Sequence, residues 1–211
     1  MAKRIFDFIV SLFGLIVFSP LIVILIILIK QDGGPIFYRG ERIGRLGKPF
    51  KIYKFRSMVI NADKLGPAST SDQDSRVTKV GRFIRKFKMD EVSQLINVFF
   101  GDMSLVGPRP EVKKFVELYT QEEKELLTLR PGITDWSSIK FHNEGEIIEK
   151  SGIKDADEAY AKLIRPTKLK LQLKYLKERT FWTDVKIIFF TIVTIISTRM
   201  GKGIIGVPEI E

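Results

Sequence analysis

The sequence predicts a helix-rich α/β protein, and three observations support that prediction. An uncharged apolar segment covers residues 8–29, and apolar residues recur at helical spacing in several later stretches. Between these, short apolar runs separated by glycines over residues 35–56 are typical of strands and turns. The chain of 211 residues suits one compact domain with an appendage. We therefore expect a membrane anchor (1–32), a globular domain (33–199) and a C-terminal tail (200–211).

The composition excludes several kinds of site. The chain has no cysteine, so disulfides, thiolate metal sites and a cysteine nucleophile are ruled out. Its single histidine, His142, cannot form a two-histidine metal centre within one chain. The 35 basic and 25 acidic residues give a net charge of +10. Such a charge indicates an anionic partner: phosphate, nucleic acid or an acidic membrane surface.

The apolar segment 8–29 is long enough to cross a bilayer, but its flanks argue against a simple crossing. A straight helix of this length would span about 33 Å, and the bilayer core is about 30 Å thick. Basic residues lie on both sides, although such flanks prefer the cytoplasmic face. Ser19-Pro20 lies in the middle, where proline predicts a kink and the serine hydroxyl could satisfy a freed backbone group. Physics alone leaves a kinked crossing and a re-entrant helical hairpin both open.

The remaining elements follow in chain order. After the strands of 35–56 we expect a polar loop over 61–79, a basic helix over 81–88 and a helix over 89–100 that Gly101 ends. We then expect an amphipathic helix over 111–129, a turn at 130–132 and a lysine-rich helical stretch over 155–179 that Pro166 interrupts. The apolar stretch 181–198 carries charges and is too short to span a membrane, which favours an interfacial or core helix.

The strongest candidate for chemistry is the acidic pair Asp90-Glu91. Carboxylates in the first turn of a helix are common for electrostatic reasons alone, but here they follow a basic run and precede Pro108-Arg109-Pro110. Adjacent carboxylates can share one Mg²⁺, and an aspartate can attack phosphorus. Arg109 has a planar fork that fits phosphate oxygens, and Lys54 and Arg56 are further candidates for an anion site.

At this point the residues show a resemblance. The sequence resembles the bacterial sugar transferase family, the monotopic phosphoglycosyl transferases or polyprenyl-phosphate sugar-1-phosphate transferases, in their short form. The likeness runs in order over roughly residues 3–198. The matching segments are residues 3–7, Ser19-Pro20, 34–37, 50–58, 74–78, 90–98, 101–110 and 130–134.

The resemblance implies an activity and roles for the dyad. Such enzymes transfer a sugar-1-phosphate from a nucleotide sugar, usually a UDP-sugar, to undecaprenyl phosphate and release UMP. They use Mg²⁺, and the aspartate, here Asp90, attacks the phosphate attached to the sugar. Glu91 would support the metal or the acid–base work, so both are candidate metal ligands. The candidate phosphate-binding residues are Lys54, Arg56, Arg76, Arg82, Arg85 and Arg109.

The resemblance also implies a location and a topology. The anchor would be a re-entrant hairpin broken at Ser19-Pro20, in the lipid of the bacterial inner membrane. A small catalytic domain with interfacial helices would lie on the cytoplasmic face. We expect nucleotide sugar, polyprenyl phosphate and membrane lipid as partners, and no nucleic acid. The sequence leaves the oligomeric state, the sugar and the glycan pathway open.

Two features depart from the family pattern, and one alternative function competes. Relatives often have glycine and then glutamine after the segment 130–134, where this chain reads Asp135-Trp136-Ser137-Ser138, and Gln172 stands where relatives often have aspartate. These positions are where we expect contacts to the sugar or nucleotide. We expect His142 to be a surface or satisfied side chain. The alternative function is a membrane-tethered basic protein that binds nucleic acid or lipid without catalysis, but the chain shows no recognised nucleic-acid motif.

Overall fold

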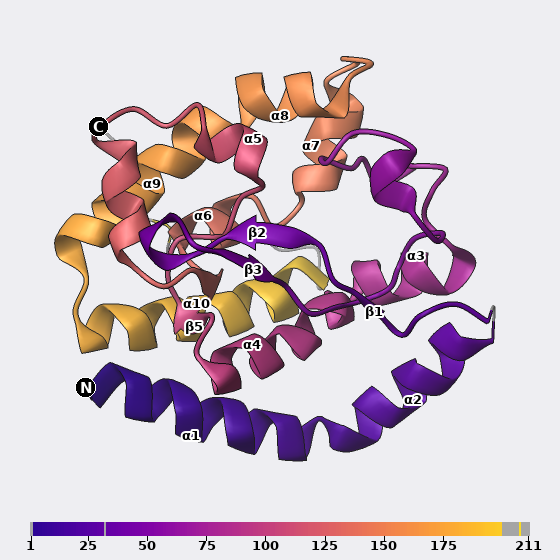
Figure 1. The fold of residues 1–211 in the computed structure, drawn as a ribbon, viewed down its shortest axis with the longest axis horizontal. Coiled ribbons are helices and arrows are strands. Elements are labelled where there is room, and N and C mark those ends of the chain that lie inside the picture. The colour runs from indigo at the N-terminus through magenta and orange to yellow at the C-terminus, as the bar shows by residue number, and fades with distance from the viewer. Residues whose placement is uncertain (1, 32, 200–206, 208–211) are drawn as a thin grey trace.

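The computed structural model describes residues 2–31, 33–199 and 207, so the predicted tail 200–211 falls almost wholly outside the described residues. Helices dominate the architecture (Figure 1). They are α1 (Ala2–Val17), α2 (Ser19–Lys30), α3 (Lys79–Lys86), α4 (Leu95–Phe100), α5 (Lys113–Val116), α6 (Trp136–Lys140), α7 (Glu144–Lys150), α8 (Ala156–Leu163), α9 (Arg165–Glu178) and α10 (Phe181–Arg199). The helix-rich prediction is confirmed.

The strands are short and pair two at a time. β1 (Phe37–Tyr38) is antiparallel to β4 (Lys54–Phe55), and β2 (Glu41–Ile43) is antiparallel to β3 (Pro49–Lys51). β5 (Ser104–Val106) and β6 (Gly132–Thr134) are parallel. Their backbones approach so closely that a Cβ on Gly132 would lie 2.1 Å from the amide nitrogen of Gly107, so only glycine fits there.

The bend predicted at Ser19-Pro20 is present. The axes of α1 and α2 differ by 62°, with the break between Val17 and Ser19. Pro20 lacks the N–H that would reach the Ile16 carbonyl in a straight helix. The Ser19 hydroxyl donates to that carbonyl at 2.7 Å and so satisfies the freed group, as the sequence predicted.

Two of the predicted helices are wrong or incomplete. The predicted helix 89–100 is split into the 3₁₀ helix η3 (Met89–Gln94) and α4. The long helix predicted over 111–129 does not form; the chain makes only α5 and the 3₁₀ helix η4 (Glu123–Thr128) there. Tertiary packing explains the second error, because Phe115, Tyr119 and Leu126 are buried in two separate apolar clusters that one straight helix could not reach together.

Polar contacts tie the start of α1 to the globular domain. The buried carboxylate of Asp7 accepts hydrogen bonds from the Ser104 hydroxyl at 2.8 Å and the Leu105 amide at 3.1 Å. The Arg4 guanidinium donates to the Phe99 carbonyl at 2.7 Å, at the C-terminal end of α4, where the helix dipole favours a cation. The α1 helix therefore packs along α4, and its position relative to the domain is fixed at its N-terminal end.

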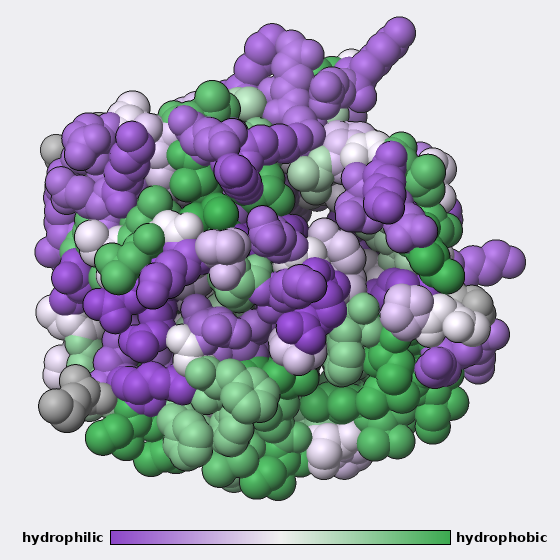
Figure 2. Space-filling view, in the orientation of Figure 1, coloured by the Kyte–Doolittle hydropathy of each residue, from purple (hydrophilic) through white to green (hydrophobic). Residues whose placement is uncertain are grey.

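The outer surface of α1 and α2 is apolar. Figure 1 shows the two helices as an arc along one edge of the molecule, and Figure 2 shows a hydrophobic band along that edge, below a mostly hydrophilic surface. Exposed large apolar residues on these helices and at the break include Ile5, Phe8, Ile9, Leu12, Phe13, Ile16, Val17, Phe18, Val23, Ile24 and Ile27. Among the described residues no single helix is long and apolar enough to cross a membrane; the bent α1–α2 pair meets the length and composition criteria together.

Candidate active site

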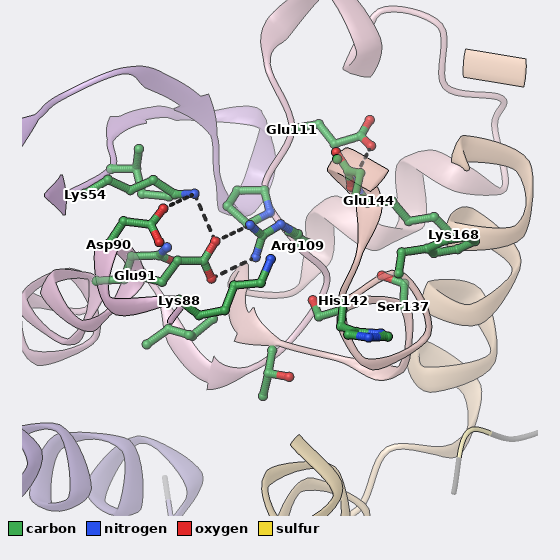
Figure 3. Close-up of a pocket in the computed structure, with 18 of the residues that line it drawn as sticks. Lys54, Lys88, Asp90, Glu91, Arg109, Glu111, Ser137, His142, Glu144 and Lys168 are labelled. Carbon is green, nitrogen blue, oxygen red and sulfur yellow. Dashed lines mark hydrogen bonds and ion pairs between the residues drawn. The ribbon is translucent and has the colours of Figure 1, made fainter. Parts of the chain in front are cut away.

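A cleft of about 470 Å³ brings together residues from distant parts of the chain. Its walls come from β4, η3, the Pro-rich segment after β5, the corner between α6 and α7, and the helices α8, α9 and α10. Figure 3 shows the labelled side chains from these elements converging on the cleft, with Asp90 and Glu91 on one side.

Local structure fixes the Asp90-Glu91 dyad against β4. The residue before η3, Lys88, has φ +54°, which turns the chain sharply out of α3. The Ser93 hydroxyl then donates to the Tyr53 carbonyl at 3.1 Å, and the Asn97 side-chain oxygen accepts from the Tyr53 amide at 2.7 Å. These bonds hold η3 and α4 against the strand that carries Lys54.

Two basic residues hold Glu91. The Arg109 guanidinium donates through both terminal nitrogens to the two Glu91 oxygens, with Nη1–Oε2 at 3.2 Å. Lys54 Nζ lies 2.9 Å from Glu91 Oε1 and 3.7 Å from Asp90 Oδ2. Such bidentate, charge-assisted contacts fix both distance and orientation. The dyad, Lys54 and Arg109, predicted as separate motifs, therefore form one cluster.

The two carboxylates of the dyad have opposite electrostatic environments. Burial raises the pKa of Asp90, and the neighbouring charge of Glu91 adds to the effect while Lys54 opposes it. Burial also acts to raise the pKa of Glu91, but Arg109 and Lys54 outweigh it and hold that pKa well below its usual range. Glu91 in turn raises the pKa of Arg109. Glu91 is thus a fixed anion, and Asp90 is the carboxyl whose protonation responds to its surroundings.

Asp90 has one carboxylate oxygen available to a ligand. The residue is only 7 % exposed, and its Oδ1 has no hydrogen-bond partner among the described residues. An unsatisfied buried acceptor is costly, and here it lies in the wall of the cleft. Such an oxygen can contact a bound cation or a reacting phosphorus.

The donor set fits Mg²⁺ as a substrate-bound ion. In the described part of the chain, no group of three or more acidic or histidine side chains could hold a metal unaided. Asp90 offers a hard oxygen donor that is unpartnered among the described residues, whereas both Glu91 oxygens bond to Arg109 and would reach a cation only alongside it. Mg²⁺ commonly takes one or two carboxylates together with waters and substrate phosphates. The two residues predicted as metal ligands are therefore compatible with Mg²⁺ that arrives with a phosphate.

The other predicted phosphate-binding residues do not all reach the cleft. Arg85 lines it, but Arg56, Arg76 and Arg82 do not. Arg56 is buried and donates to the carbonyls of Pro35 and Ile29, at 2.6 and 3.1 Å. Arg76 pairs with Asp74 and donates to the carbonyls of Ala62 and Pro67. In this structure Arg56 and Arg76 hold backbone segments together, and their roles toward phosphate stay predictions.

Sequence reasoning missed several cleft residues. Gln94, one turn after Asp90, is 1 % exposed and lines the cleft with neither amide atom partnered in the described chain. His142, expected at the surface or satisfied, is partly buried in the cleft wall with Nδ1 unpartnered among the described residues. Burial and Lys88 lower the pKa of His142, which keeps its imidazole neutral. The sequence feature that could have identified Gln94 is its spacing from Asp90, which would place both residues on one face of the predicted helix.

The two departures from the family pattern contact each other. Gln172 Nε2 donates to Asp135 Oδ2 at 2.8 Å, and the same oxygen accepts the Arg109 amide at 3.3 Å. Neither Asp135 nor Gln172 lines the cleft, whereas Ser137 and Ser138 do. The expectation of substrate contacts at these positions therefore applies to the two serines, and Asp135 acts on the cleft through the backbone of Arg109.

Comparison with known proteins shows to which protein family this chain belongs. The family model described as "Bacterial sugar transferase" matches residues 1–198. The chain belongs to that family, as its sequence motifs indicated.

Several curated relatives cover most of the chain. It is 37 % identical over 199 residues to a UDP-N-acetylgalactosamine-undecaprenyl-phosphate N-acetylgalactosaminephosphotransferase of Aeromonas hydrophila, covering 92 % of this chain and 44 % of the relative. It is 38 % identical over 204 residues to an undecaprenyl-phosphate galactose phosphotransferase of Salmonella typhimurium, covering 90 % and 39 %. The exopolysaccharide production protein ExoY of Sinorhizobium fredii is 35 % identical over 214 residues, covering 94 % and 87 %. The chain thus spans less than half the length of the first two relatives.

Proposed function

We propose that this protein transfers a sugar-1-phosphate from a UDP-sugar to undecaprenyl phosphate and releases UMP, as the first membrane step of cell-surface glycan synthesis. One observation carries the proposal: the buried dyad places an unpartnered Asp90 oxygen in a cleft beside Lys54 and Arg109. The activities for which the relatives from Aeromonas and Salmonella are named point to the same reaction class.

The reaction proceeds through two displacements at phosphorus. A carboxylate oxygen of Asp90 attacks the phosphorus attached to the sugar, and the bond from that phosphorus to the oxygen of the UMP phosphate breaks. UMP departs with the bonding electrons. An oxygen of the lipid phosphate then attacks the aspartyl-phosphosugar, the bond between phosphorus and Asp90 breaks, and the free carboxylate returns.

Each residue around the dyad has a part in that scheme. Phosphoryl transfer depends mainly on positioning and on neutralising charge. Arg109 and Lys54 fix Glu91 and provide positive charge beside the transferring group. Asp90 and Glu91 would hold Mg²⁺, which when bound supplies charge neutralisation for the diphosphate. Lys54 is the cation nearest Asp90 and favours its ionised, nucleophilic form.

The bent helices would hold this chemistry at the lipid surface. We infer that α1 and α2 enter and leave the cytoplasmic face of the inner membrane as a re-entrant hairpin. The 62° bend and the exposed apolar residues along both helices support this topology. Because the basic flanks lie on both sides of the hairpin, this arrangement leaves them all on one face. A polyprenyl phosphate anchored in lipid could then reach the same carboxylate as a soluble donor.

The decisive experiment follows label from donor to protein to lipid. A UDP-sugar labelled in the phosphate attached to the sugar is incubated with the purified protein, without acceptor. We expect Mg²⁺-dependent release of UMP, about one per protein, and label that stays with the protein until polyprenyl phosphate removes it. Asp90→Asn should keep its fold, retain no label and lose more than about a thousandfold in turnover. Lipid product formed without any label on the wild-type protein would refute the covalent route.

A further inference from the structure

The cleft has a second polar half that the displacement at phosphorus does not use. It is formed by Glu111, Tyr160 and Lys168, with Ser138 and His142 beside them. Figure 3 shows Glu111, His142 and Lys168 on the other side of Arg109 from Asp90. These groups come from the segment after Pro110, from the α6–α7 corner, and from α8 and α9.

A buried ion pair organises this half. Glu111 and Lys168 are each 5 % exposed, and Lys168 Nζ lies 3.0 Å from Glu111 Oε1. Lys168 also donates to the Tyr160 hydroxyl at 2.6 Å, and that hydroxyl donates to the same Glu111 oxygen. Both partners therefore converge on Oε1. The second oxygen, Oε2, is buried and has no partner among the described residues.

The unused oxygen of Glu111 specifies the chemistry of its ligand. Burial acts to raise the pKa of Glu111, but Lys168 and the Tyr160 hydrogen bond outweigh it and hold the pKa below its usual range. An ionised carboxylate only accepts hydrogen bonds. Its ligand is a cation or a group with a hydrogen-bond donor, and an ionised phosphate is neither. Because Lys168 already pairs with the Glu111 charge, a neutral donor such as a hydroxyl suits the second oxygen better than a further cation. Stability alone is a weak explanation for the cluster, because apolar residues often replace a buried ion pair without loss.

Glu111 and the dyad line the same cleft, joined through Arg109. Glu111 follows Arg109 by two residues, with Pro110 between, so their Cα atoms are at most about 7 Å apart. The Arg109 guanidinium is bonded to Glu91, next to Asp90. A sugar ring bonded to a phosphoryl group at Asp90 would extend into this cleft, which Glu111 also lines. The buried Ser138 Oγ and His142 Nδ1, unpartnered within the described ranges, border the same space.

We propose that Glu111, held by Lys168 and Tyr160, accepts hydrogen bonds from ring hydroxyls of the donor's sugar and so determines which sugar is transferred. This inference rests on the proposed function. The half of the cleft around Asp90 and Glu91 then carries out the phosphoryl transfer, and the half around Glu111 selects the sugar. Glu111 is thereby a specificity-determining residue.

Donor selectivity tests the proposal. UMP release by the wild type is measured with UDP-glucose, UDP-galactose, UDP-N-acetylgalactosamine and monodeoxy analogues of the preferred sugar, each as kcat/KM. A site built to bind a hydroxyl discriminates strongly against a substrate lacking it, so we expect one deoxy analogue to lose on the order of 100-fold. In Glu111→Gln that loss should shrink at least tenfold. An undiminished loss for every analogue would overturn the proposal.

A second series distinguishes the sugar from the nucleoside. The same comparison is made between UDP-sugar and 2′-deoxy-UDP-sugar. If Glu111→Gln abolishes a preference for ribose and leaves the sugar preference intact, Glu111 reads the nucleoside and the proposal is wrong. If the wild type releases no UMP with any donor, the proposed function fails; if it is active and its sugar preference is unchanged in Glu111→Gln, this inference alone fails.

Two further variants guard against a folding artefact. Tyr160→Phe removes the hydroxyl that donates to Glu111 and leaves the pair with Lys168 in place. It should weaken the deoxy-sugar discrimination by a few fold in the same direction, and an unaltered profile contradicts the proposal even when Glu111→Gln fails to fold. Glu122→Gln is the matched control, since it neutralises a carboxylate in the exposed pair with Lys177. Its donor profile should equal that of the wild type.

Discussion

Basic side chains around the cleft and around the bent N-terminal helices carry the same positive charge, but the first bind carboxylates and the second bind main-chain carbonyls. Lys54 and Arg109 bind the carboxylates of the dyad and line a cleft. Arg4 and Arg56 bind main-chain carbonyls: Arg4 those at the end of α4, and Arg56 those of Pro35 and Ile29. The first set keeps positive charge in the cleft, where we propose that the substrate binds, and the second uses its charge to hold main-chain segments together.

The difference explains where this protein gives up stability and where it gains it. Around the cleft, Asp90 Oδ1 and both amide atoms of Gln94 are buried without partners among the described residues, which costs free energy in the unliganded state. Around α2, the buried Arg56 donates hydrogen bonds to two main-chain carbonyls, which stabilises the native state. Substitutions in the two regions should therefore separate activity from stability.

Among these basic residues, the largest effect is expected at Arg109. Arg109→Lys keeps the positive charge but loses the two-pronged contact with Glu91. We expect a loss of about 100- to 1000-fold in kcat for UMP release, of the size seen when one preorganised donor is removed. The unfolding temperature should change little. A variant within threefold of the wild type would show that Arg109 is structural, like Arg56, and would break the comparison.

Arg56 should give the opposite result. Arg56→Met removes a guanidinium that is 6 % exposed and leaves the carbonyls of Ile29 and Pro35 without their donor. We expect a loss of about 2–3 kcal/mol in the free energy of unfolding, with kcat per folded molecule within twofold of the wild type. Thermal unfolding in detergent and UMP release on the same sample measure the two quantities. A large fall in kcat with stability intact would restore the predicted phosphate-binding role.

The sequence predicts the elements that depend on local signals. The kink follows from Ser19-Pro20, and the helices predicted over 81–88 and 181–198 form as α3 and α10. The dyad is proposed from adjacent carboxylates in a basic context, and its catalytic role stays a prediction. The long helix over 111–129 is wrong because apolar spacing also fits a chain that bends between two clusters. The spacing of apolar residues along the sequence does not predict where such a bend occurs.

The partners of the arginines could not be predicted for a related reason. Arg56 and Arg109 both lie in basic or proline-flanked segments that suit anion binding. Their roles diverge because Arg56 is folded against the end of α2, 27 residues earlier in the chain, whereas Arg109 reaches Glu91, 18 residues earlier. The same holds for Lys168, whose partner Glu111 is far away in sequence and unremarkable there. Long-range juxtaposition of this kind is a property of the fold.

Asp90→Asn tests whether the cleft costs the protein stability, through the pH dependence of the free energy of unfolding. Burial raises the pKa of Asp90, so the native state keeps its proton to a higher pH than the unfolded chain. The free energy of unfolding therefore falls as pH rises from about 4 through the raised pKa. Asparagine does not titrate, so the variant should be more stable than the wild type at pH 7, as thermal unfolding would measure. This gain should vanish below pH 4.

Equal stability of wild type and Asp90→Asn at all pH values would mean that ionised Asp90 costs nothing in the native state. Glu91→Gln provides the opposite sign as a control. Arg109 and Lys54 hold the pKa of Glu91 well below its usual range against the effect of burial. Its carboxylate therefore contributes stability above the unfolded pKa that is lost as pH falls. Glu91→Gln should be less stable than the wild type at pH 7.

The smallest effect is expected at the bend itself. Ser19→Ala removes the hydroxyl that donates to the Ile16 carbonyl and should cost about 0.5–1 kcal/mol in unfolding in detergent, with no change in turnover. The cost should disappear in a Pro20→Ala background, because residue 20 then regains an N–H for the same carbonyl. An equal cost in both backgrounds would show that Ser19 stabilises the hairpin by some contact other than the one that proline leaves open.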